Sequence, residues 1–332
     1  MTLVFDRHRP IDSPALAPGQ DDFDRRDDGR PELTIGLINN MPDSALKSTE
    51  RQFSRLLQAV AGNIRIRLHC FTLHSVPRSP AARLHLERDY RDIAELGRLP
   101  IDGLIVTGAE PVAGTLPEEP YWRELTEVID WAGSHTRSTI WSCLAAHAAV
   151  LHLDGIERHR LASKCAGIYD CAGVTDHWLT RDVQSPLKVS HSRFNELRES
   201  ELAASGYQIL TRSVDAGVDV FARQGQGRFM FFQGHPEYDA LSLQREYMRD
   251  VARFLSGERD DFPPIPACYF DAETEAVLAS FERRAKAARE PTLAAELPGL
   301  TLRPDIAAGS AATILFRNWV GFLGESVTAA AR

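Results

Sequence analysis

The segment from Ser138 to Val150 constrains the fold more than any other part of the sequence. Thr139, Ile140 and Trp141 are β-branched or aromatic and predict the end of a buried strand, whereas the Ala- and Leu-rich stretch after them predicts the opening of a helix. Cys143 lies at the junction. The positive end of the helix dipole favours a thiolate there, and the thiolate is the nucleophilic form of cysteine. The alternative is a buried cysteine that packs as a small apolar side chain.

A second segment favours the functional interpretation of Cys143. Residues 229–238 read Phe-Met-Phe-Phe-Gln-Gly-His-Pro-Glu-Tyr, an apolar strand that runs into a turn carrying His235 and Glu237. Side chains two apart in an extended segment lie on the same side of it. Alone, His235 is better explained as a turn histidine and Glu237 as a solvated carboxylate, but their joint presence with Cys143 predicts a site.

Strand and helix patterns alternate along the first half of the chain. Apolar runs at 33–38, 101–109 and 138–141 are separated by helical patterns at 49–57 and 121–132. This alternation predicts parallel strands with right-handed crossovers, in a sheet with helices on both faces. The run at 101–109 ends in a Gly-containing turn, and such turns at the carboxyl ends of strands are where open α/β sheets bind ligands.

The chain divides into three parts. Residues 1–31 are charge-dense and predict a disordered tail, residues 32–258 the α/β domain, and residues 259–332 a Pro-containing linker with C-terminal helices. Within the domain, five short strands are expected, as an insertion or as a continuation of the same sheet; they are at 167–169, 177–179, 187–191, 207–210 and 218–222. The last helix carries an apolar face that we expect to pack on the body or on a second subunit; this face is formed by Leu315, Trp319, Phe322 and Leu323.

Composition excludes several classes of protein. The net charge of −8 and the pI of about 5.8 argue against nucleic acid as a partner, because binding phosphates needs a basic face. No stretch approaches the roughly 18 apolar residues of a membrane span. Five cysteines show no repeating spacing, so neither a disulfide framework nor a metal site is indicated, and we expect a cytoplasmic protein.

These segments resemble a known family. Cys143 after a strand, followed much later by Gly234-His-Pro-Glu237, is similar to class I glutamine amidotransferase-like proteins. Further stretches resemble homoserine O-acyltransferases of the succinyltransferase type, in collinear order over roughly residues 33–324. They are Asn40-Met-Pro42, residues 49–57, Asp102 to Ala109, Tyr121-Trp122, Ser138-Thr139, His191-Ser-Arg193, residues 234–240, Glu246-Tyr247, Arg249-Asp-Val251, Phe316 and Asn318-Trp319. The resemblance implies a flavodoxin-like α/β fold with a helical C-terminal extension.

The resemblance also implies a reaction. Cys143 would take an acyl group from a coenzyme A thioester, either succinyl- or acetyl-coenzyme A, and form an acyl-enzyme. His235 would remove the thiol proton and later the hydroxyl proton of homoserine. Glu237 would orient His235 and stabilise its imidazolium, as the acid of a catalytic triad does. We expect acyl-coenzyme A as a co-substrate, no bound cofactor, small-molecule partners only, and a homodimer.

Further site residues follow from the resemblance. Arg249 matches the residue that holds the carboxylate of the acceptor, a task that suits a guanidinium fork, although a solvated helix arginine is the alternative. Lys164 matches a substrate-contacting lysine, and Ser192 a residue tied to substrate choice; a surface lysine and a capping serine are nearly equal alternatives. We expect His147 to serve in packing, and His191 to make a structural hydrogen bond more readily than to support the site.

The chain departs from the family pattern where the acyl donor is chosen. After Thr107-Gly-Ala109 the family has proline, an aliphatic residue, and then glycine or glutamate, whereas this chain has Glu110, Pro111 and Val112. Valine supplies no carboxylate that would repel a succinyl group, so we expect some use of succinyl-coenzyme A. The departures leave serine or another hydroxy amino acid open as the acceptor.

Two other classes of protein share these features. A glutamine amidotransferase-type hydrolase would use the same cysteine, histidine and glutamate, but it normally has glycines around its cysteine, where this chain has Trp141 and Ala145. A non-enzymatic binding protein on this fold would lose one of the three residues, and here none is missing. An acyltransferase that acts on homoserine is therefore the preferred prediction.

Overall fold

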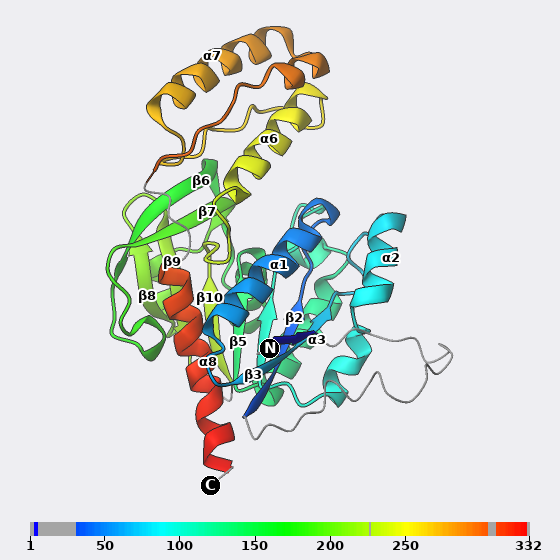
Figure 1. Cartoon of the computed structure of the whole chain (residues 1–332), viewed down its shortest axis with the longest axis vertical. Coiled ribbons are helices and arrows are strands. Elements are labelled where there is room, and N and C mark those ends of the chain that lie inside the picture. The colour runs from blue at the N-terminus through cyan, green and yellow to red at the C-terminus, as the bar shows by residue number, and fades with distance from the viewer. Residues whose placement is uncertain (1–2, 6–30, 226, 305–309, 331–332) are drawn as a thin grey trace.

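The computed structural model describes residues 3–5, 31–225, 227–304 and 310–330. Ten strands form its central sheet. The parallel ones are β1 (Leu3–Phe5), β2 (Glu32–Ile38), β3 (Arg65–Phe71), β4 (Gly103–Val106), β5 (Ser138–Ser142) and β10 (Arg228–Phe232). The antiparallel ones are β6 (His159–Gly173), β7 (Leu187–Glu196), β8 (Gln208–Ser213) and β9 (Gly217–Arg223). The order across the sheet is β1-β3-β2-β4-β5-β10-β9-β8-β6-β7, which confirms the predicted flavodoxin-like α/β fold (Figure 1).

Helices cover both faces of the sheet. The α-helices are α1 (Asp43–Val60), α2 (Pro80–Asp89), α3 (Trp122–His135), α4 (Leu144–Asp154), α5 (Glu199–Ala204), α6 (Ser242–Leu255), α7 (Ala272–Ala288) and α8 (Ser310–Ala330). Short 3₁₀-helices lie between them; those in the described residues are η2 (Ile93–Arg98), η3 (Leu116–Glu118), η4 (Trp178–Thr180) and η5 (Pro291–Glu296).

Alternation along the strands builds two cores. In β10, Met230 and Phe232 belong to the core that includes buried residues of α1 and α8, whereas Phe229 and Phe231 belong to the core formed with α3 and α4. Because successive side chains of a strand point to opposite faces, one apolar run fills both layers. The continuous apolar runs read from the sequence are therefore the strands buried on both sides.

The C-terminal helix α8 completes one of these cores. Leu315, Trp319 and Leu323 are buried against the body, as predicted for packing on the protein itself. A Cβ atom on Gly103 would lie 2.5 Å from Leu323 Cδ1 and 2.9 Å from Trp319 Cζ2, so the glycine in β4 allows the helix to approach this closely. Trp319 Nε1 also donates a hydrogen bond to Ser138 Oγ, at 3.0 Å. α8 is thus tied to the strand that leads to Cys143.

A third apolar cluster forms outside the sheet. It joins α6 and α7 with the segment between them, and in Figure 1 these two helices lie at one end of the molecule, beyond β6 and β7. Tyr247 and Phe254 of α6 and Phe281 of α7 are among its buried residues. The Pro-rich segment 262–266 therefore leads into further packed structure, not out of the compact part.

Three sequence expectations are wrong in detail. Residues 3–5 were placed in the disordered tail, but they form β1, which pairs in parallel with β3 and makes β3 an inner strand; the rest of the tail, 6–30, lies outside the described residues. The strand predicted at 177–179 is replaced by the 3₁₀-helix η4 (Trp178–Thr180). Helix α1 starts at Asp43, before the helical pattern predicted at 49–57. No described helix is long and apolar enough to cross a membrane.

Candidate active site

Cys143 occupies the turn between β5 and α4. Its backbone angles are φ 53° and ψ −115°, a region that non-glycine residues rarely adopt and that is found most often at functional sites. Its N–H donates to the carbonyl of Phe232 at 2.7 Å, and its own carbonyl accepts from Ala146 and His147 at the start of α4. The turn therefore sets the cysteine at the N-terminus of the helix, as the sequence predicted.

Neighbouring strands bring His235 to Cys143. β10 runs parallel to β5, with Phe232 opposite Ser142, so the residues after the two strands emerge at the same edge of the sheet. His235 Nδ1 lies 2.8 Å from Glu237 Oε1, and both side chains are buried. The three residues of the predicted triad are thus adjacent, although their roles in a reaction remain a proposal.

The surroundings of His235 favour its charged form. Burial alone would lower its pKa, but the negative charges of Glu237 and of the Cys143 thiolate, together with hydrogen bonds to both, raise the pKa well above its ordinary value. The backbone N–H of His235 donates to the carbonyl of Ser190 at 2.7 Å, and the ring of Tyr238 stacks on the imidazole at 4.2 Å. These contacts fix the plane of the imidazole.

Gly108, in the loop after β4, allows a close approach to Leu144, the first residue of α4. A Cβ atom on Gly108 would lie 2.7 Å from Leu144 Cβ and 3.0 Å from its backbone nitrogen. The first N–H groups of a helix have no partner within the helix. The Leu144 N–H, next to Cys143, is therefore in position to stabilise the negative oxygen that forms when a thiolate attacks a carbonyl.

The three predicted substrate residues gather around two acids of α6. Lys164 Nζ lies 2.7 Å from Asp250 Oδ2 and 3.8 Å from Glu246 Oε2. Arg249 donates to Asp250 Oδ1 at 3.0 Å, and Ser192 Oγ donates to Glu246. Lys164, Ser192 and Arg249 line the same cavity as Cys143. The structure thus brings these positions together in one cavity.

Glu246 is a site residue that sequence reasoning missed. Its carboxylate accepts hydrogen bonds from Ser192 and from the hydroxyl of Tyr238, the residue that stacks on His235. It therefore connects the base to the substrate positions. The signal was available in the sequence, because Glu246, Arg249 and Asp250 have the i, i+3, i+4 spacing that places charged side chains on one face of a helix.

Val112 lies at the rim of the cavity. Its side chain is 65% exposed, while its backbone N–H and that of Ala113 donate to the buried carboxylate of Glu119, both at 3.0 Å. The loop is thus held by its backbone. The predicted influence of Val112 on donor choice stays a prediction.

Two further histidines are buried in neutral form. Burial lowers the pKa of His147 to about 3, and its Nε2 lies 3.0 Å from Gln233 Oε1, in keeping with a packing role. His191 Nε2 lies 3.5 Å from Asp219 Oδ1 and 4.0 Å from Cys171 Sγ. Burial also holds the pKa of His191 well below its ordinary value.

In the described part of the chain, the potential ligand atoms of Cys171, His191 and Asp219 lie close enough together to hold a metal ion, within 4.8 Å of one another. Burial raises the pKa of the Cys171 thiol far above its ordinary value. The three side chains form a buried polar group that includes the neighbour of Ser192 in β7.

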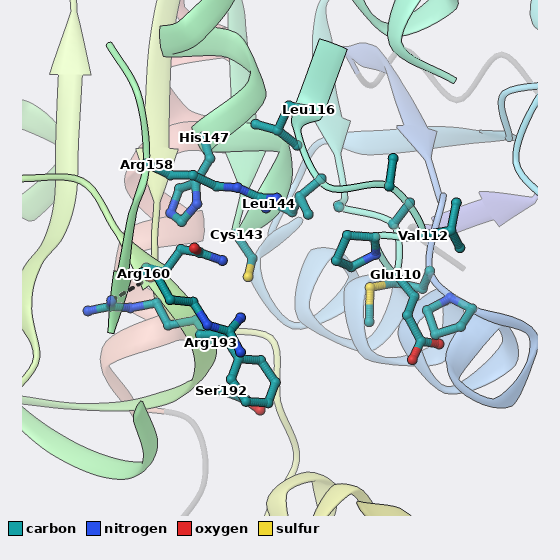
Figure 2. A pocket seen from close by; sticks show the side chains of 18 of the residues that line it. Glu110, Val112, Leu116, Cys143, Leu144, His147, Arg158, Arg160, Ser192 and Arg193 are labelled. Carbon is teal, nitrogen blue, oxygen red and sulfur yellow. Dashed lines mark hydrogen bonds between the residues drawn. The ribbon is translucent and has the colours of Figure 1, made fainter. Parts of the chain in front are cut away.

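A cavity of about 880 Å³ opens on Cys143 and His235 (Figure 2). One wall comes from the loop after β4, and the opposite one from β6, β7 and α6. Five basic residues line it, Arg158, Arg160, Lys164, Arg193 and Arg249, against three acids, Glu110, Glu157 and Glu246. The protein as a whole carries a net charge of −8, so this excess of basic over acidic side chains is local and suits anionic ligands.

Comparison with known proteins gives consistent matches along the chain. The family described as homoserine O-succinyltransferase matches residues 15–330. A homoserine O-succinyltransferase from Bradyrhizobium japonicum is 63% identical over 98% of this chain and 100% of its own length, and one from Rhodopseudomonas palustris is 57% identical over 96% and 98%. Among solved structures, a glutamine amidotransferase from Thermotoga maritima covers 88% of this chain and 98% of its own, at a TM-score of 0.49 and 13% identity.

Proposed function

Because the chain belongs to the homoserine O-succinyltransferase family, we propose that it transfers a succinyl group from succinyl-coenzyme A to the hydroxyl of homoserine. The observation that carries this proposal is the buried pair of His235 and Glu237 beside Cys143, in a cavity whose lining has more basic than acidic side chains. Coenzyme A, the succinyl group and homoserine all bear anionic groups that such a cavity can hold. In a cell the product would serve methionine biosynthesis.

The first half-reaction acylates Cys143. His235 takes the thiol proton, and the sulfur forms a bond to the thioester carbonyl carbon of the donor. The carbonyl oxygen becomes negative and accepts a hydrogen bond from the Leu144 N–H. When the oxygen re-forms its double bond, the bond to the coenzyme A sulfur breaks, and that sulfur takes the proton from His235. The products are succinyl-Cys143 and coenzyme A.

The second half-reaction uses the same groups in the opposite sense. His235 accepts the proton of the homoserine hydroxyl while its oxygen attacks the thioester of succinyl-Cys143. The Cys143 sulfur then leaves and recovers a proton from His235, which releases the ester. Glu237 stabilises the imidazolium each time it forms, through its 2.8 Å hydrogen bond to Nδ1. We assign Arg249 to the homoserine carboxylate, with Lys164 and Ser192 on the same side.

The decisive experiment follows the acyl-enzyme. The protein is incubated with succinyl-coenzyme A without an acceptor, and its intact mass and the release of coenzyme A are measured. We expect one succinyl adduct, located on Cys143 by peptide mapping, that disappears when homoserine is added. Cys143→Ala should lose both the adduct and the transfer. An adduct on another residue, or ammonia release from glutamine without acylation, would contradict the proposal and favour the hydrolase.

Serine serves as the comparison acceptor. It is one methylene shorter than homoserine, so its hydroxyl and its carboxylate cannot both reach Cys143 and Arg249 in the same way. We expect succinyl-Cys143 to be discharged faster by homoserine. Equal or faster discharge by serine would assign the acceptor to the shorter hydroxy amino acid and leave the acyl-enzyme chemistry unchanged.

A further inference from the structure

Two arginines reach the cavity from one short segment. Arg158 lies just before β6 and Arg160 is its second residue. Their spacing of two places both side chains on the same side of an extended chain, and both line the cavity. In Figure 2, Arg158 extends toward Leu144, and Cys143 lies between Arg158 on one side and Ser192 on the other. Arg158 thus lies on the side of the nucleophile away from Ser192.

Arg158 is the half-buried arginine of the cavity that has no hydrogen-bonded or ion-paired partner among the described residues. Arg249 is bonded to Asp250, and Arg193 donates to the carbonyls of Asn195 and Ala216. Arg160 is exposed and lies 4.6 Å from the ring centroid of Phe194. Within the part of the chain that the structure describes, no oxygen atom forms a hydrogen bond or ion pair with the Arg158 guanidinium.

The acid that acts on Arg158 electrostatically is already occupied. Tyr121 and then Glu119 influence the charge of Arg158, but burial raises the pKa of the Tyr121 hydroxyl and so keeps it neutral, and the Glu119 carboxylate accepts the backbone N–H groups of Val112 and Ala113, each at 3.0 Å. Arg158 is half-buried, and Cys143 is among the groups whose charge influences it. A half-buried guanidinium close to the nucleophile, with no counter-ion of its own, is suited to an anion that comes with the substrate.

The acyl group of the proposed reaction supplies such an anion. Once succinyl is bound to Cys143, its far end is a carboxylate that stays within a short, fixed reach of the sulfur. The carboxylate of homoserine already has Arg249, on the Ser192 side of Cys143, so the two carboxylates need separate cations. A guanidinium forms two parallel hydrogen bonds with a carboxylate, which binds it and fixes its direction.

We propose that Arg158 binds the terminal carboxylate of the succinyl group and so selects a dicarboxylic acyl donor. The proposal rests on the proposed function, since it names the recognition of the donor at the same site. It places the main donor selectivity on Arg158, inside the cavity, and not on Val112 at its exposed rim. Selection would then act by attraction of the correct donor.

The test compares two donors of equal chain length. Succinyl-coenzyme A ends in a carboxylate and butyryl-coenzyme A ends in a methyl group; all other parts, including the phosphates, are shared. The rate of coenzyme A release without acceptor and the mass of acyl-Cys143 are measured for both donors. In the unmodified protein we expect succinyl to be preferred by roughly 100-fold, the effect of a pair of charge-assisted hydrogen bonds.

Arg158→Gln should remove most of this preference by slowing acylation by succinyl-coenzyme A. Butyryl-coenzyme A should be affected far less, and its rate reports in the same sample that the variant is folded. Arg158→Lys keeps the charge but loses the fork, so it should retain only part of the preference. Arg160→Gln removes one positive charge from the same cavity and should leave the ratio of the two rates unchanged.

Several outcomes would overturn the assignment. An unchanged ratio in Arg158→Gln would show that Arg158 does not read the carboxylate. If Arg158→Gln lowers the acylation rate equally for both donors and its circular dichroism spectrum is unchanged, Arg158 would instead bind coenzyme A or support the structure of the site. If Arg160→Gln loses the preference for succinyl-coenzyme A to the same extent, the preference would come from the overall positive charge of the cavity and not from Arg158. Failure of the unmodified protein to be acylated by either donor would overturn the proposed function itself, and this inference with it.

Discussion

Glu237 is the residue whose removal best separates a working triad from a coincidence of neighbours. Glu237→Gln keeps the size of the side chain but removes the charge that stabilises the imidazolium of His235, 2.8 Å away. Loss of the acid in serine proteases costs about 10⁴ in turnover, and a cysteine depends on it less, so we expect a loss of roughly 10² to 10³. The measurement is the burst of coenzyme A release without acceptor.

The pH profile of the same variant provides a second readout. Burial lowers the pKa of His235, but Glu237 and Cys143 raise it to well above the ordinary value. His235 must hold a proton to protonate the leaving sulfur, so the rate should fall at high pH as that proton is lost. Removing Glu237 removes a cause that raises the pKa, and the falling limb should move to lower pH. A limb that does not move would show that the pair is only structural.

Arg249→Lys is the control for both measurements. It lies on the assigned acceptor side, so it should raise the homoserine concentration needed for discharge while leaving acylation nearly intact. A lost burst in Arg249→Lys would show that the two sides of the site are wrongly assigned.

At the scale of residues, the sequence predicted the reacting side chains of the site better than the side chains that position them. Cys143 and His235 stand out because few other residue types can perform their chemistry. Glu246 and Tyr238 do not, since a glutamate on a helix and a tyrosine in a turn usually have structural roles. Only the folded chain shows that both contact the groups around His235, because β7, β10 and α6 meet there.

At the scale of elements, the contact between the β4 loop and α4 should be sensitive to one methyl group. Gly108→Ala would place a Cβ 2.7 Å from that of Leu144, closer than such atoms pack, so the loop must move away from the helix terminus. We expect acylation to slow by at least about tenfold, because the Leu144 N–H then loses its alignment with the developing oxyanion. The burst rate with succinyl-coenzyme A measures this.

Gly133→Ala is the matched control for that change. Gly133 lies on α3, and the nearest atom to its added Cβ is Phe229 Cζ at 3.8 Å, an ordinary contact. The control should keep its activity and gain a little stability, since alanine favours a helix. A Gly108→Ala protein as active as this control would show that the close approach has no role in the reaction.

Helix α8 should contribute strongly to stability. Trp319 is fully buried over Gly103, and its Nε1 donates to Ser138 Oγ at 3.0 Å. Trp319→Ala should lower the free energy of unfolding by about 3–5 kcal/mol, the cost of truncating a large core side chain. Arg317→Ala, at an exposed position of the same helix, should change it by less than about 0.5 kcal/mol. Urea unfolding of the unmodified protein and of the two variants measures these changes. A similar unfolding midpoint for all three proteins would show that α8 does not unfold together with the rest of the domain.

Elements with a strong apolar period were predictable, and those fixed by tertiary contacts were not. The apolar strands at 33–38 and 229–233 and the helix at 121–132 follow from side-chain pattern alone, which is why β2, β10 and α3 are found there. β1 was missed because three residues carry too little pattern, and it exists through its pairing with β3. The 3₁₀ turn at 178–180 was missed because His177 accepts the Leu179 N–H through its own side chain, at 3.2 Å, and so bends the chain.

At the scale of the whole molecule, the site joins two differently built halves of one sheet. The parallel half supplies Cys143 and His235 at the ends of β5 and β10, where adjacent carboxyl ends meet. The antiparallel half supplies Arg158, Lys164 and Ser192 from β6, its entry and β7, and α6 adds Arg249. The nucleophile thus comes from the most regular part of the fold, and the binding groups come from its extension.

The acid stability of the whole molecule should depend on a histidine buried between these halves. Burial, reinforced by the charge of Arg193, lowers the pKa of His147 in the folded protein to about 3, whereas in the unfolded chain it is close to 6.5. Below about pH 6.5 the unfolded state therefore binds a proton that the folded state does not, and stability must fall as the pH falls toward 3. For one proton the slope is about 1.4 kcal/mol per pH unit.

The variant His147→Gln tests this dependence. It removes the titrating group while keeping a side chain that can still bond to Gln233, so the free energy of unfolding of the variant should fall less steeply between pH 6 and pH 4.5. All other titrating groups are common to both proteins and cancel in the difference. Urea unfolding at several pH values gives the two slopes, and parallel curves would mean that His147 already holds its proton in the folded state.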